Sequence, residues 1–150
     1  MRDKKYLLLI LLVFLLFSTG CSTNIRKEPP QLIATVNKER IETTRGTYQW
    51  QTKNFFSNTT TVADAASPSQ IAQDIKPQTV KGSSTVNVEF NDQSQPKLHA
   101  YLWGKEERTK KLSLDRNQVI LPSEKGKYVI EISSKWPKGD ASYTLVVKVQ

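Results

Sequence analysis

The chain has 150 residues, of which 37% are hydrophobic and 24% are charged, and its formal net charge is +8 at pH 7. This length suits one domain with a single hydrophobic core. The sole cysteine, Cys21, excludes a disulfide within the chain and a cysteine-based metal site.

Residues 1–20 have the pattern of an export signal. Three basic residues precede an apolar run over 6–17, and small residues follow the run. The run has twelve residues, whereas a membrane-spanning helix needs about 20. Ser18-Thr19-Gly20-Cys21 resembles the lipobox of bacterial lipoproteins, in which the cysteine receives a diacylglyceryl group and becomes the mature N-terminus. We therefore predict a helical lipoprotein signal peptide over 1–20 and lipid attachment at Cys21, which places the protein on the outer face of the cytoplasmic membrane.

Cleavage before Cys21 would remove three basic residues and one acidic residue, which leaves 19 basic against 13 acidic residues and a net charge of +6. This excess suits contact with anionic lipid headgroups or an anionic wall polymer. Alternatively, it only keeps the domain soluble. The export signal disfavours a nucleic acid as partner.

Residues 21–31 are polar and contain Pro29-Pro30, which predicts a flexible, extended tether. The folded domain is expected over 32–150. Alternation over 32–36 predicts its first strand, followed by a turn over 37–40 and a strand over 41–44. Gly46 allows a second turn, and a strand is expected over 47–51.

Residues 52–66 form the one stretch without a regular period. It contains Phe55 and Phe56 and a polar run, so we expect an irregular insertion. A short helix should follow it, because Ser67 can cap a helix, Pro68 suits its first position and Gln70 completes a capping box. Lys76-Pro77 should end this helix.

From Val80 onward the pattern consists of strands and turns. Apolar residues alternate with polar ones over 86–90, 98–102 and 128–132, and over 143–149 near the C-terminus. About eight short strands predict an all-β, antiparallel sandwich. Gly126-Lys127-Tyr128 after a loop is typical of the corner of an immunoglobulin-like fold.

Four short motifs resemble a group of small, uncharacterised membrane lipoproteins of Bacillus-type bacteria. They are Ala34-Thr35-Val36-Asn37, Gly46-Thr47-Tyr48-Gln49-Trp50, Gly126-Lys127-Tyr128 and Ser142-Tyr143. The resemblance implies the compartment and an immunoglobulin-like domain, and it implies no activity. Many members of that group carry a cysteine where Gln49 stands and another within 52–64, and this chain has neither.

The sequence offers no recognisable catalytic constellation and implies no cofactor. His99 is the single histidine, with no carboxylate within four residues, and a general base needs an orienting partner. No serine lies in a known nucleophile motif. Glu89, Asn91 and Asp92 approach a hard-cation site most closely, and we interpret them as a solvated loop.

Aromatic residues are the best candidates for a binding surface. Trp50, Phe55 and Phe56 lie in or beside the insertion, while Tyr101 and Trp103 share one face of a strand. If Leu98 and its alternating neighbours face the core, Tyr101 and Trp103 face outward, unless the insertion covers them. The opposite orientation would place Trp103 in the core.

These patterns predict a lipid-anchored, non-catalytic binding or accessory module whose partner is a cell-envelope protein or an anionic wall polymer. Two alternatives remain. One is a surface hydrolase with a site assembled from loops around His99. The other is a structural protein that associates loosely with the wall through its charge.

Overall fold

The computed structural model describes residues 26–54 and 56–150. Strands make up most of this part of the chain. They are β1 (Leu32–Val36), β2 (Glu39–Ile41), β3 (Thr43–Lys53), β4 (Asn58–Ala63), β5 (Gln78–Val80), β6 (Thr85–Phe90), β7 (Lys97–Trp103), β8 (Arg108–Lys111), β9 (Leu114–Asp115), β10 (Gln118–Ile120), β11 (Gly126–Trp136) and β12 (Gly139–Val149). One short helix, α2 (Pro68–Ile71), lies between β4 and β5.

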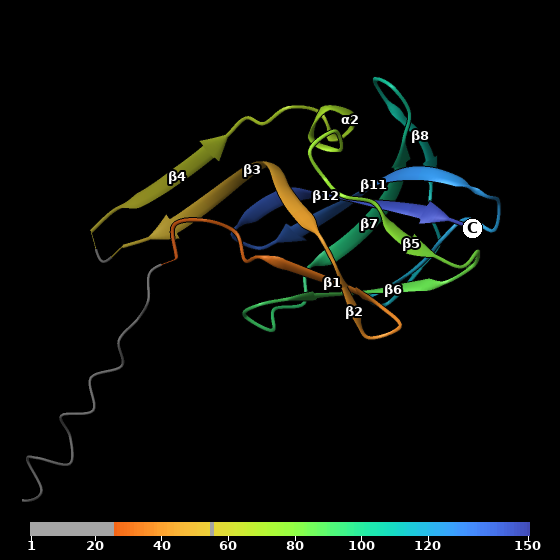
Figure 1. Cartoon of the computed structure of the whole chain (residues 1–150). Helices are drawn as coiled ribbons and strands as arrows, with labels where there is room; N and C mark the ends of the chain where they lie inside the picture. Colours follow the sequence, from red (N-terminus) through yellow and green to blue (C-terminus); the bar gives the residue numbers. More distant parts are fainter. Residues whose placement is uncertain (1–25, 55) are drawn as a thin grey trace, which may run out of the picture.

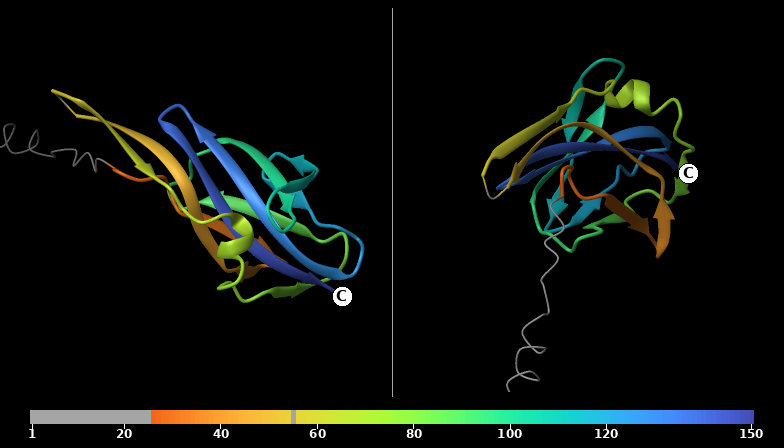
Figure 2. Two further views of the ribbon diagram at one scale, coloured as in Figure 1. Left: turned by 90° about the horizontal axis from the view of Figure 1, so that it is seen from above. Right: turned by 90° about the vertical axis from the view of Figure 1, so that its left-hand side faces the viewer.

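The strands form two sheets that pack face to face (Figures 1 and 2). One sheet has the order β2-β1-β6-β10-β9, and the other has the order β4-β3-β12-β11-β7-β8, with β5 added in parallel to β12. The orders β1-β6-β10-β9 and β12-β11-β7-β8 match strands A-B-E-D and G-F-C-C′ of an immunoglobulin sandwich. At the corner before β11, the Tyr128 hydroxyl donates to the Glu124 carbonyl oxygen at 3.0 Å. The predicted sandwich is therefore confirmed.

The core lies between the sheets and consists of residues that alternate along the strands. Val86, Val88 and Phe90 are buried from one sheet, and the predicted inward row of β12 (Tyr143, Leu145, Val147 and Val149) is buried from the other. At one end of the core, the Trp136 ring meets the rings of Trp50 and Phe90 edge to face, with centroids 5.4 and 4.9 Å apart. Such edge-to-face contacts stabilise beyond the burial of area alone.

The turn expected at Gly46 is wrong, because β3 runs unbroken from Thr43 to Lys53. Its partner β12 has an irregular register between Ala141 and Tyr143. A Cβ atom at position 46 would lie 2.5 Å from the Ser142 Oγ atom. Glycine therefore suits the close approach of the Ser142 side chain on β12 rather than a turn.

The irregular insertion expected over 52–66 is also wrong over much of its length, because residues 52–53 and 58–63 lie in strands. β3 and β4 form a hairpin whose register runs from Lys53 opposite Asn58 to Tyr48 opposite Ala63. The hairpin extends beyond the sandwich (Figures 1 and 2). Because most of β4 is exposed, its pairing requires no apolar alternation, which is the signal that identifies a strand in a sequence.

The helix begins as predicted but ends earlier. Ser67 accepts a hydrogen bond from the Gln70 amide, and the Gln70 side chain closes the capping box. The helix ends at Ile71, not at Lys76-Pro77. Ile71 and Ile75 still share a face, which packs with Val146 on the outer side of the seven-stranded sheet.

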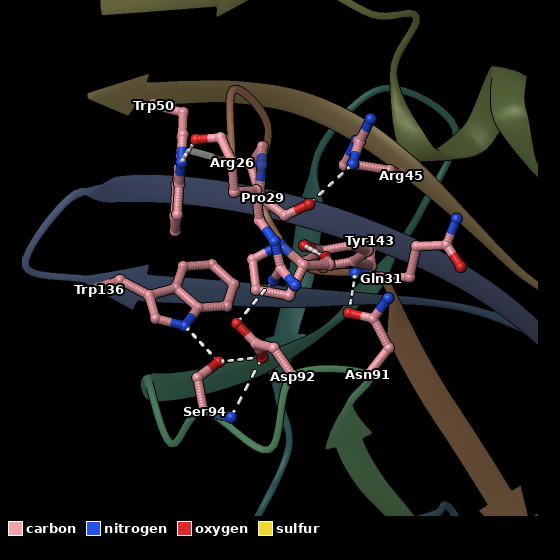
Figure 3. A network of polar contacts seen from close by, with 11 residues as sticks. Arg26, Pro29, Gln31, Arg45, Trp50, Asn91, Asp92, Ser94, Trp136 and Tyr143 are labelled. Atoms are coloured by element: carbon pink, nitrogen blue, oxygen red, sulfur yellow. Dashed lines mark hydrogen bonds and ion pairs between the residues drawn. The ribbon is translucent and has the colours of Figure 1, made fainter. Parts of the chain in front are cut away.

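The part of the expected tether that the structure describes, residues 26–31, is bound to the domain (Figure 3). The Arg26 carbonyl oxygen accepts hydrogen bonds from Trp50 Nε1 and Thr52 Oγ1, both at 3.2 Å. The Arg26 guanidinium pairs with Asp92 at 2.6 Å. This part of the tether prediction is therefore wrong, because two polar side chains of β3 fix the segment to the sheet.

The same segment continues into the core. The Pro29 carbonyl oxygen accepts from Arg45 at 2.9 Å. Pro30 is fully buried, and its carbonyl oxygen accepts from the Tyr143 hydroxyl at 2.5 Å. Burial raises the pKa of Tyr143, so this hydroxyl keeps its proton and remains a donor.

The predicted signal peptide, Cys21 and residues 22–25 of the tether lie outside the described residues. No helix within the described residues is long and apolar enough to cross a membrane.

Candidate binding face

The outer face of β7 carries the predicted aromatic row. Ala100 is buried, and Leu98 and Leu102 pack against the core. His99, Tyr101 and Trp103 therefore point outward, where they are half-buried. The predicted orientation is confirmed, and the alternative with Trp103 in the core is wrong.

A buried carboxylate fixes two of these side chains. Glu131 of β11 lies opposite Tyr101, points away from the core and is only 3% exposed. Arg108 donates to both Glu131 oxygens, at 2.8 and 2.7 Å, and Trp103 Nε1 donates to one of them at 2.5 Å. Such a bidentate pair is a strong, directional contact, and it raises the pKa of Arg108.

Arg108 also covers Tyr101, because its guanidinium lies 4.2 Å from the ring centroid. The stacked cation and the Glu131 contacts hold Tyr101 and Trp103 in fixed positions. Sequence reasoning missed Glu131 and Arg108. Glu131 occupies an ordinary polar position between two apolar residues, and only the fold shows that it is buried.

Positive charge surrounds the exposed part of this row. Lys111 lies opposite Tyr101 on β8, and Lys97 precedes His99 on the same face of β7. Burial of the ring lowers the pKa of His99. The charges of Lys111, Lys97 and Arg108 lower it further. We call the set Lys97, His99, Tyr101, Arg108 and Lys111 the basic face.

The pKa of His99 reports the positive charges of the basic face. We expect the pKa of His99 to lie below 6.5, the usual value for histidine. The double substitution Lys97→Gln/Lys111→Gln should raise this pKa, since two nearby cations are lost. NMR titration suits the test because His99 is the only histidine. The control Lys81→Gln/Lys125→Gln removes the same charge elsewhere and should leave the pKa unchanged; an equal rise in both variants would contradict the assignment.

The segment from α2 to Ile75, which follows the expected insertion, covers a neighbouring part of this sheet. Ile71, Ala72 and Ile75 pack on Val129 and Val146 of β11 and β12. The Ser69 hydroxyl donates to the Gly104 carbonyl oxygen at 2.6 Å, directly after Trp103. The helix therefore reaches the Trp103 end of the row, and the His99 end stays accessible.

The other aromatic candidates for the binding surface lie in other parts of the chain. Trp50 is 4% exposed and belongs to the core, so its assignment to a partner surface is wrong. Phe56 is 96% exposed beside the hairpin tip. Phe55 lies outside the described residues. The structure thus does not bring Phe56 together with Tyr101 and Trp103, which lie on β7.

The described surroundings of His99 contain few catalytic elements. Ser133 lies opposite His99 in the register of β11 and β7. The hydrogen bonds and ion pairs of the described residues include no carboxylate bound to His99, and Glu131 is engaged by Arg108 and Trp103. A hydrolytic triad would also need a carboxylate that orients the histidine.

The loop that resembled a cation site has structural contacts instead. The Asn91 side chain accepts from the Gln31 amide at 3.0 Å. Burial alone would raise the pKa of Asp92, but hydrogen bonds from Ser94 and the charge of Arg26 lower it. Within residues 26–54 and 56–150, no cluster of three or more His, Cys, Asp or Glu side chains could hold a metal ion.

A partly open groove of about 670 Å³ lies between the loop after β6 and the turn after β9. Phe90, Leu98, Arg116 and Asn117 are among its lining residues. None of the basic-face residues lines it, so the groove and the basic face are separate features.

Comparison of the chain with family models, curated proteins and solved structures gives no match.

Proposed function

We propose that this chain is a lipid-anchored, non-catalytic binding module at the outer face of the cytoplasmic membrane, and that its basic face binds an anionic partner. The lipobox pattern ending at Cys21 and the resemblance to small membrane lipoproteins support the anchor. The preferred partner is an anionic polymer of the cell wall. The alternative partner is a cell-envelope protein with an acidic surface, which carries charge of the same sign.

The observation that carries this proposal is the arrangement of charge on β7 and β8. Lys97 and Lys111 are exposed on either side of His99 and Tyr101, and both lower the pKa of the histidine. The one buried carboxylate nearby is engaged by Arg108. The exposed lysines thus give the face a positive field, and flat aromatic rings beside them can contact a sugar or a polymer backbone.

Binding of a soluble, poly(glycerol phosphate)-type polymer to the mature chain tests this function. Each exposed lysine contributes about 1 kcal/mol near an anionic surface. Lys97→Gln/Lys111→Gln should therefore weaken the affinity by about tenfold or more. Binding should also fall steeply as salt is added.

The matched variant Lys81→Gln/Lys125→Gln separates a specific face from overall charge. Both of its lysines are exposed and lie in turns outside the basic face. Near-wild-type binding of this variant would support the basic face. Equal weakening by both double variants would instead favour a structural protein that associates with the wall through its net charge.

A further inference from the structure

The β3–β4 hairpin is the part of the described chain that extends farthest from the sandwich (Figures 1 and 2). Phe56 lies just before β4 and is 96% exposed, the highest exposed fraction among the large apolar side chains described. Lys53 and Asn54 precede the tip and are also exposed. A phenylalanine this exposed, at the end of a projecting ribbon, can reach a surface outside the domain.

The first described residue is fixed beside the same hairpin. The Arg26 carbonyl oxygen accepts a hydrogen bond from Trp50 Nε1 of β3 (Figure 3). It also accepts one from Thr52 Oγ1 of the same strand. Only five peptide units separate Cys21 from Arg26, and a fully extended chain of this length spans at most about 18 Å. Thr52 is one residue before Lys53, so the tip extends about 10 Å beyond it at the usual rise of a strand. Acyl chains on Cys21 would therefore hold this end of the domain close to the bilayer.

The charges of this end favour an anionic membrane. Lys27 and Lys53 are exposed, and the turn that carries Lys138 lies beside the hairpin because Gln51 donates its amide to the Lys138 carbonyl oxygen at 2.7 Å. Two acidic side chains of this end are engaged: Glu28 pairs with Arg45, and Asp92 pairs with Arg26. A third, Asp140, is exposed and lies opposite Lys135 in the pairing of β11 with β12.

We propose that the hairpin tip is a second membrane contact, in which Phe56 enters the interfacial region of an anionic bilayer while Lys53 and Lys138 face its headgroups. This inference rests on the proposed lipid anchor at Cys21. Aromatic rings suit the membrane interface, and cations near an anionic leaflet add attraction. The two contacts would orient the sandwich with its basic face directed sideways.

Site-specific fluorescence on the full-length, lipidated chain tests the proposal. Once Cys21 is acylated, Phe56→Cys introduces the only free thiol, which accepts a polarity-sensitive fluorophore. The matched control is Val62→Cys on β4, since Val62 is 61% exposed but lies farther from the tip. Both proteins are reconstituted in vesicles of phosphatidylglycerol and phosphatidylcholine.

A blue shift of emission at position 56 and its quenching by lipid-embedded nitroxides, without either effect at position 62, would support the membrane contact. An aqueous spectrum at position 56 on protein that floats with the vesicles would overturn it and leave the lipid anchor intact. Protein whose mass lacks acyl chains, and which fails to float, would overturn the anchor and the inference together. A Cys21→Ala chain, which cannot be acylated at this position, is the reference for that last result.

Discussion

Removal of residues 26–31 should lower the free energy of unfolding by about 4 kcal/mol. Four side chains (Arg45, Trp50, Thr52 and Tyr143) lose carbonyl acceptors in this segment, and each such hydrogen bond contributes about 1 kcal/mol net. The Tyr143 hydroxyl suffers most, since it is buried and would be left unpaired.

Urea unfolding of two shortened chains measures this effect. A chain that begins at Arg26 retains every contact described for the segment, and it should match a chain that begins at Cys21 within about 0.5 kcal/mol. A chain that begins at Leu32 should unfold at a clearly lower denaturant concentration. If both chains unfold at the same midpoint, the segment is a tether after all, as its composition first indicated.

Substitution of Gly139 by alanine should destabilise the domain by more than about 3 kcal/mol and reduce the yield of folded protein. Gly139 has φ +152°, a conformation that costs other residues about 1–3 kcal/mol. The added Cβ would also lie 1.9 Å from the Gln49 carbonyl oxygen. Since that oxygen belongs to the backbone of β3, relief requires that the sheet itself move.

Gly126→Ala is the matched control, because its Cβ would meet only the Tyr128 ring at an ordinary 3.4 Å. Thermal unfolding followed by circular dichroism compares the two variants. The control should keep its midpoint within a few degrees. Equal midpoints for Gly139→Ala and the wild type would show that β3 and β12 do not approach as closely as the structure has them.

The sequence predicts the parts of this fold that bury one face. In β6 and β12, every second residue enters the core, and the alternation of Val86, Val88 and Phe90 is readable without coordinates. The capping box around Ser67 is a local signal and is equally readable. The β3–β4 hairpin was missed because its exposed strand buries almost nothing, and the turn at Gly46 was wrong because only β12 explains that glycine.

The candidate site was predictable in part for the same reason. Period-two alternation places Tyr101 and Trp103 on the outer side of β7. The neighbours that define their chemistry come from elsewhere: Glu131 is 28 positions beyond Trp103, and Lys111 reaches Tyr101 through the pairing of β7 with β8. Trp50 was wrongly assigned to a partner surface. The alternation of residues around a tryptophan in a strand is the same whether that face of the strand packs on the core or binds a partner.

The central place of β12 has a consequence for how the chain acquires its structure. This last strand pairs with β11, β3 and β5, and its pairing with β3 joins Gly139 to Trp50 across 89 positions of sequence. Contacts between such distant residues form slowly, since a long loop must close first. The seven-stranded sheet therefore cannot be completed until β12 has been synthesised, so the pairing of β3 waits for a strand that is made much later.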